Sequence, residues 1–138
     1  MNPIRAYKET NIKTANQGKL IVMTYDGALR ALSAAADLLD KKSRELDKVN
    51  TNIIKAQSLI TELMVSLDFE RGGDIAQSLY SLYLYFNRQL MDANIDKDPE
   101  PIKEIITHMS ELRDAWSAIA SKVGGESGNA TGGVNIAG

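Results

Sequence analysis

The sequence predicts an all-α fold: an antiparallel up-down-up-down four-helix bundle with an N-terminal extension and a flexible glycine-rich C-terminal tail. Three observations support this fold class. Four segments repeat apolar residues at the three- and four-residue spacing of an amphipathic helix. No segment has the strict alternation of a strand. Short breaks rich in lysine, glycine or proline separate the segments, so consecutive helices are expected to run antiparallel.

The 138 residues suit one domain with a substantial core, and their composition divides the chain into three parts. Residues 1–15 mix apolar and polar side chains and are expected to pack on the bundle as an N-terminal segment. Residues 16–123 contain the four helices. Residues 124–138 are rich in glycine and too poor in apolar side chains to offset the entropy lost on ordering, so we expect a flexible tail.

The first helix is expected from Asn16, which suits the N-cap, to about Lys42. Its core line is Ile21, Tyr25, Ala28, Leu32 and Leu39. An adjacent line is rich in small residues, which let another helix approach closely: Leu20, Gly27, Ala31, Ala34 and Leu38. The interpretation that we prefer for this line is tight packing within the chain, and a groove for a partner is the alternative.

The second and fourth helices show a single apolar face each. The second, near residues 47–68, has the core line Val49, Ile53, Ala56, Ile60, Leu63 and Leu67. The fourth begins near Pro99 and Pro101, since proline suits the first turn of a helix, and runs to about Val123. Its apolar face is Ile102, Ile105, Ile106, Met109, Leu112, Trp116, Ile119, Ala120 and Val123.

The third helix carries more apolar surface than one core contact requires. The glycines at 72 and 73 break the pattern before it, Asp74 favours its start, and it ends around residues 94–98. One line is assigned to the core: Ile75, Leu79, Leu82, Phe86, Leu90 and Ala93. A second apolar line lies beside this core line on the helix surface, and either another helix of the chain or another molecule is expected to cover it. Its residues are Tyr80, Leu84, Asn87 and Met91, with Tyr83 at the border.

Catalytic and metal chemistry find no support in the residues. The chain has no cysteine, and its one histidine, His108, follows Glu104 by four residues, whereas di-iron bundles need Glu-x-x-His. The acidic residues around the two glycines lack the ligand spacing of a calcium loop. No phosphate loop, nucleophile elbow or dinucleotide motif is present. We therefore expect no enzyme activity, no metal and no cofactor.

Charge and hydropathy also limit the partners and the location. The net charge of −2 and the absence of a lysine and arginine cluster argue against nucleic acid. No apolar run is long enough for a signal peptide or a membrane span, so we expect no membrane insertion and a protein that stays in the compartment where it is made.

Several motifs between residues 4 and 123 resemble those of one family and follow one another in the same order as in that family. They are Ile4-x-Ala6-Tyr7, Thr14-Ala15 before Lys19-Leu20-Ile21, Tyr25-Asp26-Gly27-Ala28, Gly72-Gly73-Asp74-Ile75-Ala76, Leu82-Tyr83-Leu84-Tyr85 and Asp114-Ala115-Trp116. Together they resemble the flagellar export chaperone for flagellin, the FliS family. The chain departs from that family at Asn16-Gln17-Gly18, where many relatives have Ser-Pro-Glu, and at Gln89, where a second arginine often follows the first.

The resemblance implies a cytoplasmic bundle that binds the disordered C-terminal segment of flagellin in a 1:1 complex. Such a chaperone prevents premature polymerisation and keeps flagellin competent for flagellar type III secretion, and contacts with the flagellar export gate are a further expectation. Ile4 and Tyr7 match residues that lie on the bundle and take part in binding. The expected partner-binding residues are therefore Ile4, Tyr7, Leu20, Gly27, Ala31, Tyr80, Tyr83, Leu84, Asn87 and Met91. A structural homo-oligomer without a client is the alternative.

Overall fold

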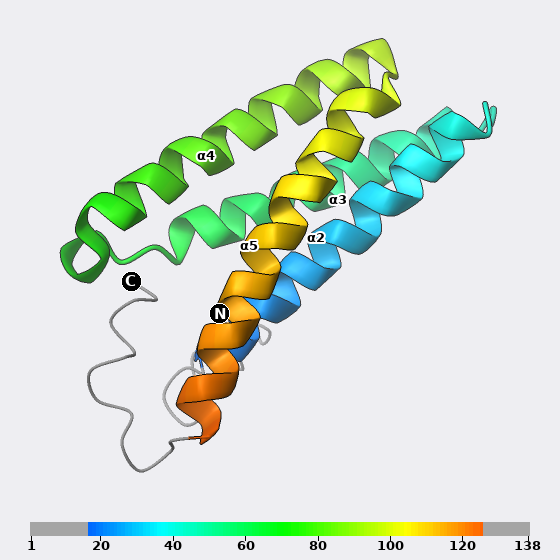
Figure 1. The fold of residues 1–138 in the computed structure, drawn as a ribbon. Coiled ribbons are helices and arrows are strands. Elements are labelled where there is room, and N and C mark those ends of the chain that lie inside the picture. Colours follow the sequence, from blue (N-terminus) through cyan, green and yellow to red (C-terminus); the bar gives the residue numbers. More distant parts are fainter. Residues whose placement is uncertain (1–16, 126–138) are drawn as a thin grey trace, which may run out of the picture.

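The computed structural model describes residues 17–125, and these form four helices with no strand among them (Figure 1). Their bounds are α2 Gln17–Asp40, α3 Leu46–Val65, α4 Phe69–Asp96 and α5 Pro99–Gly125. Helix α2 packs on α3 and α5, and α4 packs on the same two helices. The predicted four-helix bundle is thus confirmed. Predictions for Ile4, Tyr7 and the tail beyond residue 125 lie outside the described residues.

Local chemistry accounts for the connection between α4 and α5. Helix α4 ends at Lys97, which adopts a left-handed backbone conformation (φ 53°). Pro99 then occupies the first position of α5, as predicted, and the Asp98 carboxylate accepts a hydrogen bond from the Glu100 amide at 3.0 Å. Helix α5 continues two residues beyond the predicted limit, to Gly125.

The break predicted at the glycine pair lies at Gly73, but the helix begins earlier than expected. Gly73 has φ 49° and ψ −123°, which interrupts the helical backbone. A separate turn, Phe69–Gly72, precedes it, and the Asp68 carboxylate accepts hydrogen bonds at 3.1 Å from the Glu70 and Arg71 amides. Asp74 therefore follows a kink inside α4 and does not begin the element.

The core consists of heptad-spaced side chains from all four helices. Fully buried examples recur at intervals of seven residues, as Val49 and Ala56 do in α3 and Ile102 and Met109 in α5. A strict seven-residue repeat keeps one seam facing the neighbouring helices, as in coiled coils. Burial of each leucine or isoleucine side chain contributes about 1.5–3 kcal/mol before entropic costs. Most predicted core positions of α2, α3 and α5 are buried in these seams, whereas Leu39, Leu67 and Leu112 are only partly buried. The side chain of Val123 lies outside the described residues.

Two consecutive residues of the Tyr-Asp-Gly-Ala motif tie α2 to different neighbours. Asp26 accepts hydrogen bonds from Arg113 of α5, at 2.8 Å from Nε to Oδ1. Both side chains are about one-third exposed. Gly27 lies against α3, where a Cβ atom at this position would meet Leu59 Cδ1 at 3.1 Å. This part of the motif therefore holds the bundle together.

Candidate functional site

Exposed apolar side chains concentrate on α4. Those of the other helices, Met23, Leu46, Ile54 and Val65, are distributed over α2 and α3. The large exposed apolar residues of α4 are Phe69, Ile75, Tyr80, Leu84, Tyr85, Met91 and Ile95. Single exposed apolar residues are ordinary, whereas a concentration of them on one element is typical of an interaction site.

The first half of α4 lacks a helix on its α5 side. In Figure 1, α5 starts beside the end of α4 and then diverges from it, crossing towards α2. Phe86, Leu90 and Ala93 are accordingly buried, as predicted, in the half near the connection. The prediction of Ile75 as a core residue was wrong, since 56% of its surface is exposed, and Leu79 is only partly buried.

This uncovered half contains an open hollow of about 270 Å³, here called the inner cleft. It is lined by Asp74, Ile75, Ser78, Leu79 and Leu82. The hollow continues the buried apolar seam of α4 beyond the point where α5 covers it. Apolar spacing alone could not mark these residues as binding candidates, because a helical stripe looks the same whether or not a neighbour covers it.

The second line of α4 remains accessible in the structure. Tyr80, Leu84 and Met91 are 37%, 40% and 53% exposed. Asn87 differs, because its side-chain Nδ2 donates to Thr61 Oγ1 at 3.3 Å and its backbone carbonyl oxygen accepts from Gln57 Nε2 at 3.1 Å. Asn87 thus bridges α4 to α3 between apolar neighbours.

Two polar bridges define the register of α3 against α4. The first is that of Asn87, and the second runs from Asn94 Nδ2 to Asn50 Oδ1 at 2.7 Å. In an antiparallel pair, the two bridges bring Ile54 to the level of Met91, and Val65 lies near the level of Tyr80. Both α3 side chains are exposed, at 49% and 70%. We call the resulting seam the outer track: Tyr80, Leu84 and Met91 of α4 with Ile54 and Val65 of α3.

Tyr83, predicted as a partner-binding residue at the border, is instead a core residue with 1% exposure. Its hydroxyl lies 2.5 Å from that of Tyr25. The reason is the heptad seam of α4, in which Ala76, Tyr83 and Leu90 recur every seven residues and are all buried. A line drawn at 3.6 residues per turn drifts away from that seam over the length of α4 and selected Leu82 in place of Tyr83.

The small-residue line of α2 is partly closed by the chain itself. Gly27 packs on Leu59 and Ala31 is 4% exposed, which confirms the preferred interpretation of packing within the chain for these two residues. Leu20 is half-buried and borders an opening. The structure therefore brings Leu20 to a hollow but leaves no open groove over Gly27 and Ala31.

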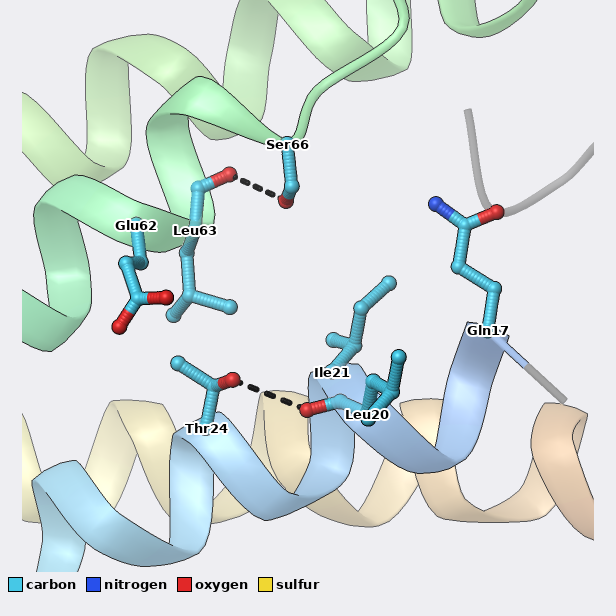
Figure 2. Close-up of a pocket in the computed structure, with 7 residues that line it drawn as sticks. All are labelled: Gln17, Leu20, Ile21, Thr24, Glu62, Leu63 and Ser66. Carbon is cyan, nitrogen blue, oxygen red and sulfur yellow. Dashed lines mark hydrogen bonds between the residues drawn. The ribbon is translucent and has the colours of Figure 1, made fainter. Parts of the chain in front are cut away.

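That opening is a hollow of about 80 Å³ between the start of α2 and the end of α3 (Figure 2). Thr24 and Ser66 donate hydrogen bonds to backbone oxygens of their own helices, at 2.9 and 2.8 Å. Their hydroxyl groups are thus already paired, and apolar side chains form much of the wall. Its lining residues are Gln17, Leu20, Ile21, Thr24, Glu62, Leu63 and Ser66. We call it the α2–α3 pocket.

The described residues contain no group of three or more histidine, cysteine or acidic side chains placed to hold a metal ion. His108 is half exposed, stacks on Phe86 with an interplanar angle of 16°, and lies 3.9 Å from Glu111. Between residues 17 and 125, no helix has the length and apolar content that crossing a membrane requires.

Comparison with known proteins identifies similar chains. The family model described as "Flagellar protein FliS" matches residues 1–123. The flagellar secretion chaperone FliS of Bacillus subtilis is 34% identical over 115 residues, which cover 83% of this chain and 84% of that protein. The Salmonella typhimurium protein of the same name is 33% identical, covering 86% and 90%. The flagellar secretion chaperone FliSB of Pseudomonas aeruginosa is 28% identical, covering 87% and 97%.

Proposed function

This chain belongs to the FliS family of flagellar proteins, and we propose that it is a cytoplasmic export chaperone for flagellin. It binds the disordered C-terminal segment of flagellin 1:1, prevents premature polymerisation and keeps the client competent for type III secretion. The observation that carries the proposal is the concentration of exposed apolar side chains on α4. It acts by binding and not by catalysis.

A disordered client needs several apolar contacts because it loses conformational entropy when it binds. That ordering costs about 2–5 kcal/mol of the gross interaction energy. Burial of one large apolar side chain recovers about 1.5–3 kcal/mol, so a single anchor is not enough. The outer track and the inner cleft lie along one helix and together supply many anchors, with Leu84 near the middle of the first and Ile75 at the edge of the second.

The apolar spacing of the outer track suits a helical client segment. Tyr80, Leu84 and Met91 are four and seven residues apart, which aligns them on one side of α4. An amphipathic helix that presents residues at the same spacing lies lengthwise in such a groove. The asparagine bridges to α3 separate the apolar positions and hold the two walls at a fixed distance.

The N-terminal segment, residues 1–15, is proposed to pack on the bundle and to contribute Ile4 and Tyr7 to client binding. The α2–α3 pocket supports this proposal because Gln17, near which the segment joins the bundle, is one of its lining residues. Leu20 of the predicted binding set lies in the same wall. Alanine at both Ile4 and Tyr7 is expected to weaken client binding.

Isothermal titration calorimetry with a peptide of the flagellin C-terminal segment tests the proposed function. The expected result is a 1:1 complex, with a scrambled peptide of the same composition as the control. Absence of binding at micromolar peptide would contradict the proposal. Light scattering on the free protein then addresses the alternative, because a permanent dimer that the peptide does not dissociate would favour a structural homo-oligomer. Co-purification with export-gate proteins tests the further partner.

A further inference from the structure

An aromatic side chain of the chain itself is seated at one end of the outer track. The ring of Phe69 meets the ring of Tyr80 edge to face, with centroids 5.8 Å apart and an interplanar angle of 70°. Phe69 is 42% exposed and Tyr80 is 37% exposed, so the contact lies at the surface. Aromatic pairs favour this geometry. The end of the track near Tyr80 therefore has an occupant before any client arrives.

The segment that carries Phe69 is a unit separate from the body of α4. It is the single turn Phe69–Gly72, held by its own cap at Asp68. Gly73 connects this turn to the body through a positive φ of 49°, and a Cβ atom there would meet nothing within 4 Å. A glycine in open space has backbone freedom that other residues lack. The turn can therefore move without disturbing the buried seam.

We propose that Phe69 is an internal competitor for the outer track, which covers Tyr80 in the free protein and leaves it when a client segment docks. The inference rests on the proposed function and specifies the chemistry of the partner. The client residue that replaces Phe69 is aromatic or large and aliphatic, because it takes over the contact with the Tyr80 ring. The remaining anchors of the client lie towards Leu84 and Met91.

Only molecules in which Phe69 has left Tyr80, here called open, can bind a client at this end of the track. The apparent affinity is therefore the affinity of the open form multiplied by the fraction of molecules that is open. The contact between the Phe69 and Tyr80 rings stabilises the closed form, in which the two rings touch. A pair of this kind is strong enough to reduce the apparent affinity for a client about two- to tenfold. Removal of the Phe69 ring should therefore tighten client binding. If the ring were part of the client surface, its removal would weaken binding.

The test compares full-length Phe69→Ala with the unchanged chain in calorimetry with the flagellin C-terminal peptide. Met23→Ala is the matched control, since it truncates another exposed apolar side chain on a different helix. We expect Phe69→Ala to bind about two- to tenfold more tightly and Met23→Ala to bind as the unchanged chain does. Asp68→Ala, which removes the cap but no apolar group, should shift affinity in the same direction by less.

Unchanged or weaker binding by Phe69→Ala would overturn the inference while leaving the proposed function intact. Absence of binding by the unchanged chain would refute both together. A second measurement uses nuclear Overhauser contacts between the Phe69 and Tyr80 rings. These contacts should be present in the free protein and lost on saturation with peptide, and their persistence in the complex would also overturn the inference.

Discussion

The hydroxyl oxygens of Tyr25 in α2 and Tyr83 in α4 lie 2.5 Å apart in the centre of the bundle. Their rings are tilted by 58° with centroids 6.4 Å apart. The pair joins two helices that otherwise pack mainly on α3 and α5. Buried hydroxyl groups require partners, and each tyrosine is the partner of the other. The contact therefore stabilises the fold and removes Tyr83 from the surface available to a client.

Replacement of Tyr83 by phenylalanine should destabilise the protein without creating a large cavity. Tyr25 loses its hydrogen bond to the Tyr83 hydroxyl inside the core and keeps that from Trp116, at a cost of about 1 kcal/mol in the free energy of unfolding. Denaturant unfolding measures the loss. Tyr85→Phe is the control, because Tyr85 is 44% exposed and the change should be within about 0.5 kcal/mol. Equal stability of both variants would contradict the buried pair.

Alkaline pH should unfold the protein through the same two tyrosines. Burial raises the pKa of Tyr25, with further increases from Tyr83, while a hydrogen bond from Trp116 acts in the opposite direction. Burial also raises the pKa of Tyr83, with the hydrogen bond to Tyr25 opposing the rise. In the unfolded chain both titrate near pH 10. The stability that they contribute is present below about pH 10 and is lost as pH rises from there towards the raised pKa of each group, by at most about 1.4 kcal/mol per pH unit for each group.

Denaturant midpoints measured from pH 8 to pH 11 test this dependence, with tyrosinate absorbance as a second probe. The double substitution Tyr25→Phe with Tyr83→Phe should reduce the slope of stability against pH above about pH 10. A slope that is the same in the double variant would assign the alkaline unfolding to other groups.

A charge on the outer track should weaken client binding and spare the fold. Leu84→Glu places a carboxylate where a client side chain would otherwise be buried, and we expect affinity for the flagellin peptide to fall about tenfold or more. Thermal unfolding should change little because Leu84 is 40% exposed. Ser81→Glu, on the exposed polar face of the same helix, is the control. A large loss of thermal stability in Leu84→Glu would indicate a core residue.

The inner cleft is tested in the same way at Ile75. Ile75→Asp should weaken peptide binding several-fold, because its side chain borders the hollow and is 56% exposed. The expected change in unfolding free energy is within about 0.5 kcal/mol, as for most surface substitutions. Gln77→Asp introduces the same charge on the exposed face of α4. Equal peptide affinities for these two variants would remove the inner cleft from the binding surface.

Gly27→Leu distinguishes packing within the chain from a groove for a partner. A Cβ atom added at Gly27 would lie 3.1 Å from Leu59 Cδ1, so a leucine side chain is expected to push α2 and α3 apart. We expect a loss of about 1–3 kcal/mol in the free energy of unfolding. Unchanged stability together with weaker peptide binding would instead place Gly27 in a client groove.

The number and order of the helices, and most of their ends, could be predicted because local chemistry sets them. Pro99 begins α5 and Gly73 interrupts α4 through backbone preferences that act within a few residues. The core lines of α3 and α5 were also predictable, since each helix has a single apolar face. The core of α2 takes in Ala31 from the adjacent small-residue line as well. In α4 a line drawn at 3.6 residues per turn assigned Leu82 to the core, whereas the seven-residue repeat of the packed helix buries Tyr83 there instead.

Apolar spacing and motifs were enough to predict four amphipathic helices in a bundle, surplus apolar surface on α4, and a resemblance to one family. The position of that surplus depends on how the helices pack. The divergence of α5 leaves Ile75 exposed and Leu79 only partly buried. Leu84 is exposed beside α3, whereas Tyr83 is buried against Tyr25 of α2. The physical reason is that periodicity records which side chains share a face of a helix. Whether a neighbour covers that face depends on the direction in which distant helices cross.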